Sequence, residues 1–302
     1  MEVAKKLTIA GLSTALVIAS ASLYIIHTGF AIKPDATAAA SLRPWTVAQS
    51  PEVNTSALQY PPLNNIFLVT IPKSASEHIV LLLTKTLNYK PPSSYARYHF
   101  PNDEFDLPKM HALFYRDQRI VKSHLLPTEN NVEVYRRFTD RLVLHLRDPR
   151  QVLLSWVYHL DSDKQADRPL PPNYYLWDFN QKLNWHIDQT MPKIIAWITG
   201  WLEIKQREDK KPGGLNIFVT TYDDLLINER DLLVKILVFN GISTRALDNY
   251  THLPPESSPH FRKANPNEWK SACTAEQKHR LSDIVPPDLL RRFNWQVYES
   301  EK

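Results

Sequence analysis

The sequence predicts an α/β fold, a three-layer α/β/α arrangement around a central parallel sheet, preceded by an N-terminal transmembrane helix. Two observations predict this. Short apolar runs alternate with segments of helical periodicity, and one long uncharged run lies near the N-terminus. A parallel strand that is buried on both faces has a short, continuous apolar sequence. Helices that alternate with such strands join them by right-handed crossovers.

The composition limits the class of function. The chain has 302 residues, 43% of them hydrophobic, and a formal net charge of +4. Without its N-terminal part it suits one large α/β domain of about 240 residues. The positive excess is mild, so it fits a site for a small polyanion better than a nucleic-acid groove. Cys273 is the single cysteine, which excludes an intrachain disulfide.

The uncharged run at residues 7–32 predicts a membrane anchor. It holds no Asp, Glu, Lys or Arg and exceeds the roughly 20 residues that cross a bilayer. Lys5 and Lys6 precede it, so the positive-inside rule favours a cytosolic N-terminus and a lumenal domain. A cleaved signal peptide, with Ala38–Ala40 as its cleavage site, is the main alternative, and a buried helix is another.

The predicted organisation has four parts. Residues 1–6 form an N-terminal tail and residues 7–32 the anchor. Residues 33–63 are rich in Ala, Pro, Ser and Thr without periodicity, which indicates a stem. Residues 64–302 form the globular domain.

Within this domain the apolar runs predict four strands, and the periodic segments predict the helices between them. The strands are expected at residues 66–71, 119–123, 141–146 and 215–220. Helices are expected at residues 77–88, from a cap at Asp148 with Pro149 in the first position, and at 173–206 and 224–239.

The first predicted strand is followed by the turn Pro72-Lys-Ser-Ala-Ser and then by a helix. A helix N-terminus behind a buried strand is suited to bind phosphate, because its backbone N–H groups and dipole favour an anion. Lys73 would add a positive charge there, and Ser74 and Ser76 would add hydroxyl donors. The Walker pattern is absent, which argues against an NTPase or kinase of that type. The alternative for Lys73 is a surface lysine on a loop.

Three further segments carry residues that suit anion chemistry. Lys122 and His124 are two apart in a strand, so they share a face, and a histidine there can act as a general base. Arg147 follows a strand, and Ser155 lies two turns into the next helix; arginine suits bidentate phosphate contact. Arg262 and Lys263 lie in a Pro- and Asn-rich loop. Each of these segments, taken alone, could be ordinary surface structure. Arg150, three residues after Arg147, is expected to be a charged residue on the surface.

Together these segments resemble the PAPS-dependent sulfotransferase family over residues 64–295. The loop T-I-P-K-S-A-S-E-H at 70–78 is similar to the family's 5′-phosphosulfate loop, T-Y-P-K-S-G-T-T-W. The segments K-S-H-L-L-P, R-D-P-R-Q-V-L-L-S, T-Y-D-D-L and F-R-K-A also match family motifs in order and spacing.

The resemblance implies roles for the matched residues. Lys73, Lys122 and His124 would be catalytic, with His124 as the base that takes the acceptor hydroxyl's proton. The implied donor-binding residues are Lys73, Ser74, Ala75, Ser76, Glu77, His78, Arg147, Ser155, Tyr222, Arg262, Lys263 and Ala264. The co-substrate would be PAPS (3′-phosphoadenylyl sulfate) and the product 3′,5′-ADP. The acceptor would be a hydroxyl-bearing small molecule or glycan. No metal and no nucleic-acid partner is expected.

Four positions depart from the family pattern. Ala75 and Ala264 replace glycines, Glu77 stands where a threonine meets the 5′-phosphate, and His78 replaces a tryptophan that stacks on adenine. A non-catalytic, membrane-anchored relative that has lost donor binding is therefore the alternative function. The anchor favours a single-pass membrane protein with a lumenal, Golgi-like catalytic domain, and a cytosol-facing domain is the other possibility.

Overall fold

The computed structural model describes residues 64–90, 96–97, 104–105, 110, 118–163, 170–254, 257 and 262–295. The predicted tail, the anchor at 7–32 and the stem at 33–63 lie outside these residues. In the described ranges, no helix combines the length and apolar character needed to span a bilayer.

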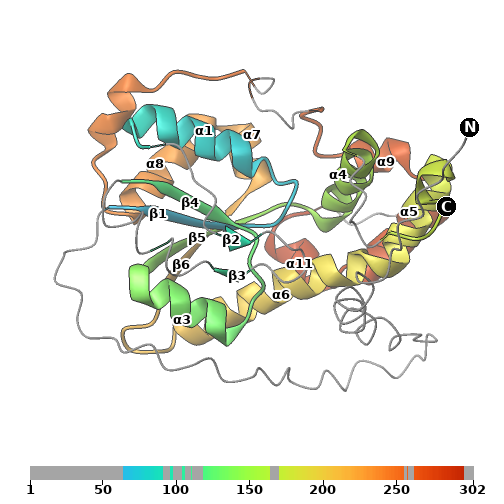
Figure 1. The fold of residues 1–302 in the computed structure, drawn as a ribbon, viewed down its shortest axis with the longest axis horizontal. Helices are drawn as coiled ribbons and strands as arrows, with labels where there is room; N and C mark the ends of the chain where they lie inside the picture. Colours follow the sequence, from blue (N-terminus) through green and yellow to red (C-terminus); the bar gives the residue numbers. More distant parts are fainter. Residues whose placement is uncertain are drawn as a thin grey trace, which may run out of the picture. The chain divides into compact units, whose positions relative to one another are not determined.

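A four-stranded parallel sheet forms the centre of the fold and confirms the predicted architecture (Figure 1). Its strands lie in the order β4, β1, β5, β6, with bounds Ile120–Ser123, Ile66–Thr70, Arg141–Leu146 and Asn216–Thr221. In register, Leu68 of β1 lies beside Lys122 of β4 on one side and Val143 of β5 on the other. A two-residue antiparallel pair, β2 (Ala96–Arg97) with β3 (Glu104–Phe105), was not predicted.

Alternate side chains of each strand face two separate cores, so the sheet is the middle of three layers. In β1, Phe67 and Val69 face one core while Ile66 and Leu68 face the other. The first core is completed by α3 (Glu129–Phe138), α4 (Pro149–Ser162), α5 (Phe179–Gln189), α6 (Met191–Glu208), α9 (Glu268–Ala272), α10 (Ala275–Ile284) and α11 (Pro287–Arg292). The second is completed by α1 (Ser76–Leu87), α7 (Tyr222–Ile227), α8 (Glu229–Phe239) and the 3₁₀ helix η3 (Thr244–Asn249).

Local capping explains where the structure departs from the predicted helices. The segment 224–239 is two helices, because Asn228 has an extended backbone (φ −157°) and its side chain accepts a hydrogen bond from the Asp231 N–H. The segment 173–206 divides into the 3₁₀ helix η2 (Tyr174–Leu176), α5 and α6. The cap at Asp148 and the first-turn Pro149 of α4 are confirmed.

A buried carboxylate fixes the C-terminal end of α6. Glu208 is 2% exposed and accepts hydrogen bonds from Arg136 of α3 and, at 3.0 Å, from the Leu215 N–H before β6. Burial raises the pKa of Glu208, but the bonds from Arg136 and Leu215 outweigh it and hold the pKa below its usual value. Three elements therefore meet at one carboxylate.

We expect Glu208→Gln to lower the free energy of unfolding by about 2 kcal/mol, since it weakens charge-assisted hydrogen bonds at a buried site. Urea unfolding of wild type and variant at neutral pH measures this. Lys205→Gln is the matched control, because its bond to Asp209 on the same helix is exposed and is expected to contribute under about 0.5 kcal/mol. Equal losses in both variants would contradict the role of Glu208.

Candidate functional site

The loop between β1 and α1 forms the centre of the candidate site. Lys73 and Ala75 both have left-handed backbones, with φ of 66° and 64°. A glycine, which the family has at position 75, adopts such a backbone without strain, whereas an alanine there is strained by about 1–2 kcal/mol. Ala75 is also the N-cap of α1 and has no side chain that could cap it. The first N–H groups of α1 therefore have no cap from the preceding side chain.

Hydrogen bonds from neighbouring strands hold this strained loop in place. The Ser74 hydroxyl donates to the Ile71 carbonyl at 2.7 Å, so it serves the loop itself and is not the outward donor that the sequence predicted. His145 of β5 is fully buried and bonds to the Ser74 carbonyl at 3.0 Å and to the Thr220 hydroxyl at 2.9 Å. Burial lowers the pKa of His145 to about 4, so it is neutral. His145 was not predicted as a site residue, because a histidine inside a strand belongs to no local motif that marks it.

Arg147, at the end of β5, is a buried cation that contacts the same loop. Its Nη1 donates to the Lys73 carbonyl at 2.7 Å, and its Cζ lies 3.8 Å from the centre of the Tyr222 ring. Arg147 is 6% exposed and Tyr222 is 5% exposed. The Nε of Arg147 is buried without a hydrogen-bond partner among the described residues. Arg147 thus has a free donor beside a phosphate-type loop, which suits it to bind an anionic ligand.

Lys122 lies in β4 and His124 directly follows the strand; both are partly buried, while Ser123 between them is buried and bonded to Tyr135. The Lys122 ammonium is paired with the Glu77 carboxylate on α1. Glu77 therefore reaches across to β4 and does not cap its own helix. Lys122, which the resemblance implies to be catalytic, is therefore paired with a carboxylate of the protein itself.

The geometry of His124 suits a general base. Its Nδ1 lies 2.7 Å from the Thr70 carbonyl, which accepts the ring N–H and makes Nε2 the unprotonated nitrogen. Burial and the neighbouring charge of Lys122 lower the pKa of His124 to about 4. The ring is thus neutral at pH 7 and able to accept a proton.

Helix α6 holds the segment that follows β4. The indole N–H groups of Trp197 and Trp201 both donate to the Leu125 carbonyl, at 2.9 and 3.0 Å. Trp197 also lies 3.2 Å from the His124 carbonyl. Gly200 lies against Pro127, where an added Cβ would come within 2.6 Å of the proline ring. The helix thereby fixes the position of His124.

Arg262 and Lys263 lie beyond this centre and share one carboxylate. Arg262 forms a two-armed ion pair with Glu268 and stacks on Tyr158, with its Cζ 4.2 Å from the ring centre. Lys263 is exposed and 3.3 Å from Glu268. The charge of Arg262 contributes to lowering the pKa of Arg147, after the larger effect of burial, so the two arginines lie within electrostatic range.

Other predicted site residues lie apart from this group. His78 is 5% exposed, and its Nε2 bonds to Glu229 of α8 at 2.8 Å. Glu229 also bonds to Tyr250 and His252, a cluster that the sequence did not indicate. Ser76 is buried, Ser155 is partly buried and Ala264 is exposed. For Ser155, the described part of the structure shows no side-chain hydrogen bond.

Arg150 corrects an expectation, because it is fully buried and is not a surface charge. It forms an ion pair with Asp148 at 2.7 Å and stacks on Trp269, with its Cζ 4.2 Å from the ring centre. Arg150 therefore joins the start of α4 to α9 and stabilises the fold. Its Nη1 is buried without a hydrogen-bond partner among the described residues.

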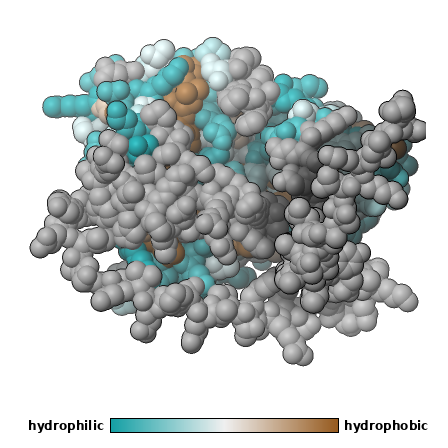
Figure 2. Space-filling model, in the orientation of Figure 1, coloured by the Kyte–Doolittle hydropathy of each residue, from teal (hydrophilic) through white to brown (hydrophobic). Residues whose placement is uncertain are grey.

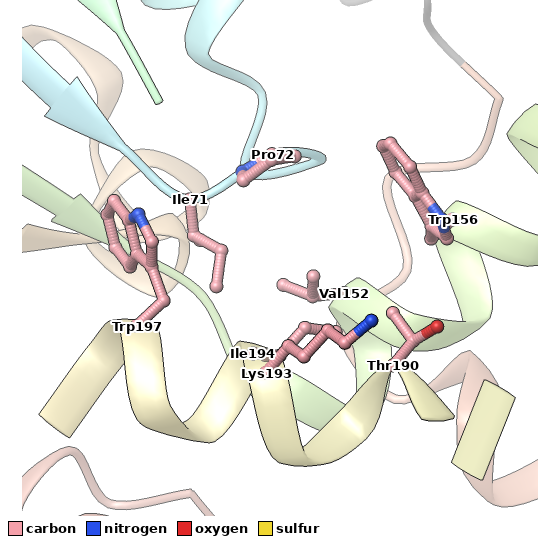
Figure 3. A pocket seen from close by; sticks show the side chains of 8 residues that line it. All are labelled: Ile71, Pro72, Val152, Trp156, Thr190, Lys193, Ile194 and Trp197. Atoms are coloured by element: carbon pink, nitrogen blue, oxygen red, sulfur yellow. The ribbon is translucent and has the colours of Figure 1, made fainter. Parts of the chain in front are cut away.

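A shallow apolar pocket, open to solvent, adjoins the loop (Figure 3). The loop, α4 and α6 line it, with residues Ile71, Pro72, Val152, Trp156, Thr190, Lys193, Ile194 and Trp197. Pro72 is next to Lys73 in the chain, and Trp197 bonds to the His124 carbonyl. The pocket therefore begins beside the predicted catalytic residues. On the face shown in Figure 2, most of the described surface that can be seen is hydrophilic.

The described residues contain no group of three or more His, Cys, Asp or Glu side chains able to hold a metal ion. The charges that the site offers to a ligand are those of lysine and arginine.

Comparison with known proteins extends these findings. The chain is 22% identical to sulfotransferase 2B1 of Mus musculus over 268 residues, covering 79% of this chain and 75% of that protein. It is 22% identical to a 3-alpha-hydroxysteroid sulfotransferase of Cavia porcellus over 211 residues, covering 60% and 68%. A crystal structure of mouse sulfotransferase SULT7A1 complexed with PAP is similar in fold, with a TM-score of 0.52 and 16% identity over 76% of this chain and 87% of that one.

A family model described as the sulfotransferase domain matches residues 63–292. The match includes β1 with its loop, the ends of β4 and β5, and the segment with Arg262 and Lys263. It covers most of the chain and agrees with the parallel sheet and the loop geometry. The chain belongs to the sulfotransferase domain family.

Proposed function

We propose that this protein transfers a sulfuryl group from PAPS to the hydroxyl group of an acceptor. The observation that carries the proposal is the buried guanidinium of Arg147, whose Nε lacks a partner among the described residues. Such a group is costly to bury without an anion, and the phosphates of PAPS supply one. The relatives named above, and the PAP bound in the mouse structure, support the same donor.

The remaining cations fit the donor's other charges. The left-handed loop at Lys73 and Ala75 lies at the start of α1, which favours binding of the 5′-phosphosulfate. Arg147 would hold the 3′-phosphate, together with Ser155 and, from the C-terminal loop, Arg262 and Lys263. Tyr222 stacks on Arg147 and would orient it. The residues present therefore fit the donor at both of its charged ends.

The chemistry needs positioning, charge stabilisation and one base. As the acceptor oxygen bonds to sulfur, its proton passes to His124 Nε2, and the bond between sulfur and the 5′-phosphate breaks. Lys73 would stabilise the negative charge that develops on the phosphate, and Lys122 the sulfuryl oxygens. The Thr70 carbonyl keeps His124 in the tautomer that accepts this proton.

Glu77 does not fit a simple donor site. In the resting protein it pairs with Lys122, the cation proposed for the sulfuryl group. Donor binding must therefore separate this pair. A non-catalytic relative that has lost donor binding is the second candidate function, and the Glu77–Lys122 pair is the observation that favours it.

We further propose that the pocket of Figure 3 receives the acceptor, because it adjoins Lys73 and the His124 segment. The uncharged run at 7–32 supports a single-pass membrane anchor with a lumenal domain, an orientation that rests on the basic residues Lys5 and Lys6.

Isothermal titration of 3′,5′-ADP into the full chain tests the donor site. We expect wild type to bind and Arg147→Ala to bind about 100-fold more weakly, since it loses charge-assisted hydrogen bonds at a buried site. Arg207→Ala removes an exposed arginine from α6 and is expected to bind like wild type.

Circular dichroism must show that each protein is folded. A folded wild type that binds no 3′,5′-ADP would refute the transferase proposal and favour the non-catalytic relative. If Arg147→Ala bound 3′,5′-ADP as tightly as wild type, the proposed role of Arg147 in binding the 3′-phosphate would be wrong.

Glu77→Gln should bind 3′,5′-ADP about fivefold more tightly than wild type, because the substitution removes a negative charge and releases Lys122. The same titration measures this. Asp209→Asn is a control that removes a carboxylate from a comparably exposed ion pair at the far end of α6. Unchanged or weaker binding by Glu77→Gln would show that Glu77 does not oppose the donor.

The pH dependence of kcat/KM reports the ionisation of His124. The neutral ring is the base, so the rate constant should fall only as the pH drops toward about 4, well below the ordinary value of 6.5. Lys122→Met removes a charge that lowers this pKa, so the acid limb should move to higher pH even though the rate is reduced. Lys205→Met is the control. A wild-type limb at or above 6.5 would contradict His124 as the base in this environment.

A further inference from the structure

The acceptor pocket has one charged side chain, and nothing in its lining neutralises it. Apart from Thr190 and Lys193, the lining is apolar or aromatic, and no Asp or Glu takes part. The Thr190 hydroxyl is already bonded to the His186 ring at 2.7 Å. In the described ranges, the Lys193 ammonium forms no ion pair. A cation at the edge of an apolar pocket attracts an anionic group of a ligand.

Lys193 lies about one helical turn from the residue of α6 that contacts the His124 segment. Trp197, which bonds to the His124 carbonyl, is four residues further along α6. Four helical residues rise about 6 Å, so the Cα atoms of Lys193 and Trp197 are separated by about one turn along the helix axis. In Figure 3, its side chain extends from α6 toward the side of α4. Ile194 and Val152 also line the pocket and would contact an apolar body.

We propose that the acceptor is an amphipathic hydroxy acid, with its hydroxyl group at the Lys73–His124 end and an acidic group paired with Lys193 across an apolar or aromatic body. This inference rests on the proposed function for the hydroxyl end. The assignment of an acidic group to the acceptor rests on the residues that line the pocket, independently of the proposed function. The class excludes neutral alcohols and amines as preferred acceptors. The reaction would give a product that carries a sulfate ester at one end and an acid at the other.

Three probes of one shape but different charge test this. Para-hydroxyphenylpropanoate carries an acid, para-hydroxyphenylpropanamide is its neutral isostere, and para-hydroxyphenylpropylamine is a cation. Calorimetric titration into the full chain, with 3′,5′-ADP absent and then present, gives their affinities. Lys193 is exposed, so we expect wild type to prefer the acid over the amide by about three- to fivefold, the size of an exposed ion pair, and to bind the amine most weakly.

Variants of Lys193 identify the source of the preference. Lys193→Met keeps the length of the side chain and should bind acid and amide equally. Lys193→Arg should retain the preference, and Lys193→Glu should invert it in favour of the amine. Lys205→Met, at a partly exposed lysine about three turns along the same helix, is the control and should behave like wild type. The same order should appear in kcat/KM with PAPS.

The outcomes separate this inference from the proposed function. Equal affinity of wild type for acid and amide, no binding of the acid, or an acid preference that survives Lys193→Met would each overturn it. An acid preference that depends on Lys193, with no transfer from PAPS, would support the pocket and refute the transferase. Transfer from PAPS to the amide and the acid with equal kcat/KM would support the transferase and refute the preference for an acid.

Discussion

The contact of Arg147 with the Lys73 carbonyl is the constraint on which the rest of the site depends. It joins the end of β5 to the loop after β1, and the same guanidinium stacks on Tyr222 at the start of α7. His145, two residues earlier in the chain, holds the next carbonyl of the loop. One strand therefore holds a loop whose left-handed residues would otherwise relax. The strain persists because these buried hydrogen bonds oppose it.

Much of the architecture could be predicted, because buried parallel strands and periodic helices leave a strong pattern. The four strands lie within one residue of their predicted bounds, and the cap at Asp148 is where the sequence placed it. The break at Asn228 was missed because the periodicity continues across it, and only the capping hydrogen bond reveals it. The short β2–β3 pair has two residues per strand, too few to form a pattern.

The site was predicted less completely, since residue type shows which group is present but not what it contacts. The resemblance indicated Lys122 as a catalytic residue and raised doubt about Glu77, but it could not show that the two pair with each other. It treated Arg150 as a surface charge, although this side chain is fully buried against Trp269. His145 and Glu229 act through contacts distant in sequence, which no local motif records.

Helix α6 has two functions that are physically inseparable. Trp197 bonds to the backbone of the His124 segment and also forms a wall of the pocket that we assign to the acceptor. A change in the size of this wall would also shift His124, the proposed base. Under the proposed function, substitutions of Trp197 would therefore alter acceptor range and rate together. Substitutions of Lys193, which lines the pocket without holding His124, would be expected to alter the acceptor range alone.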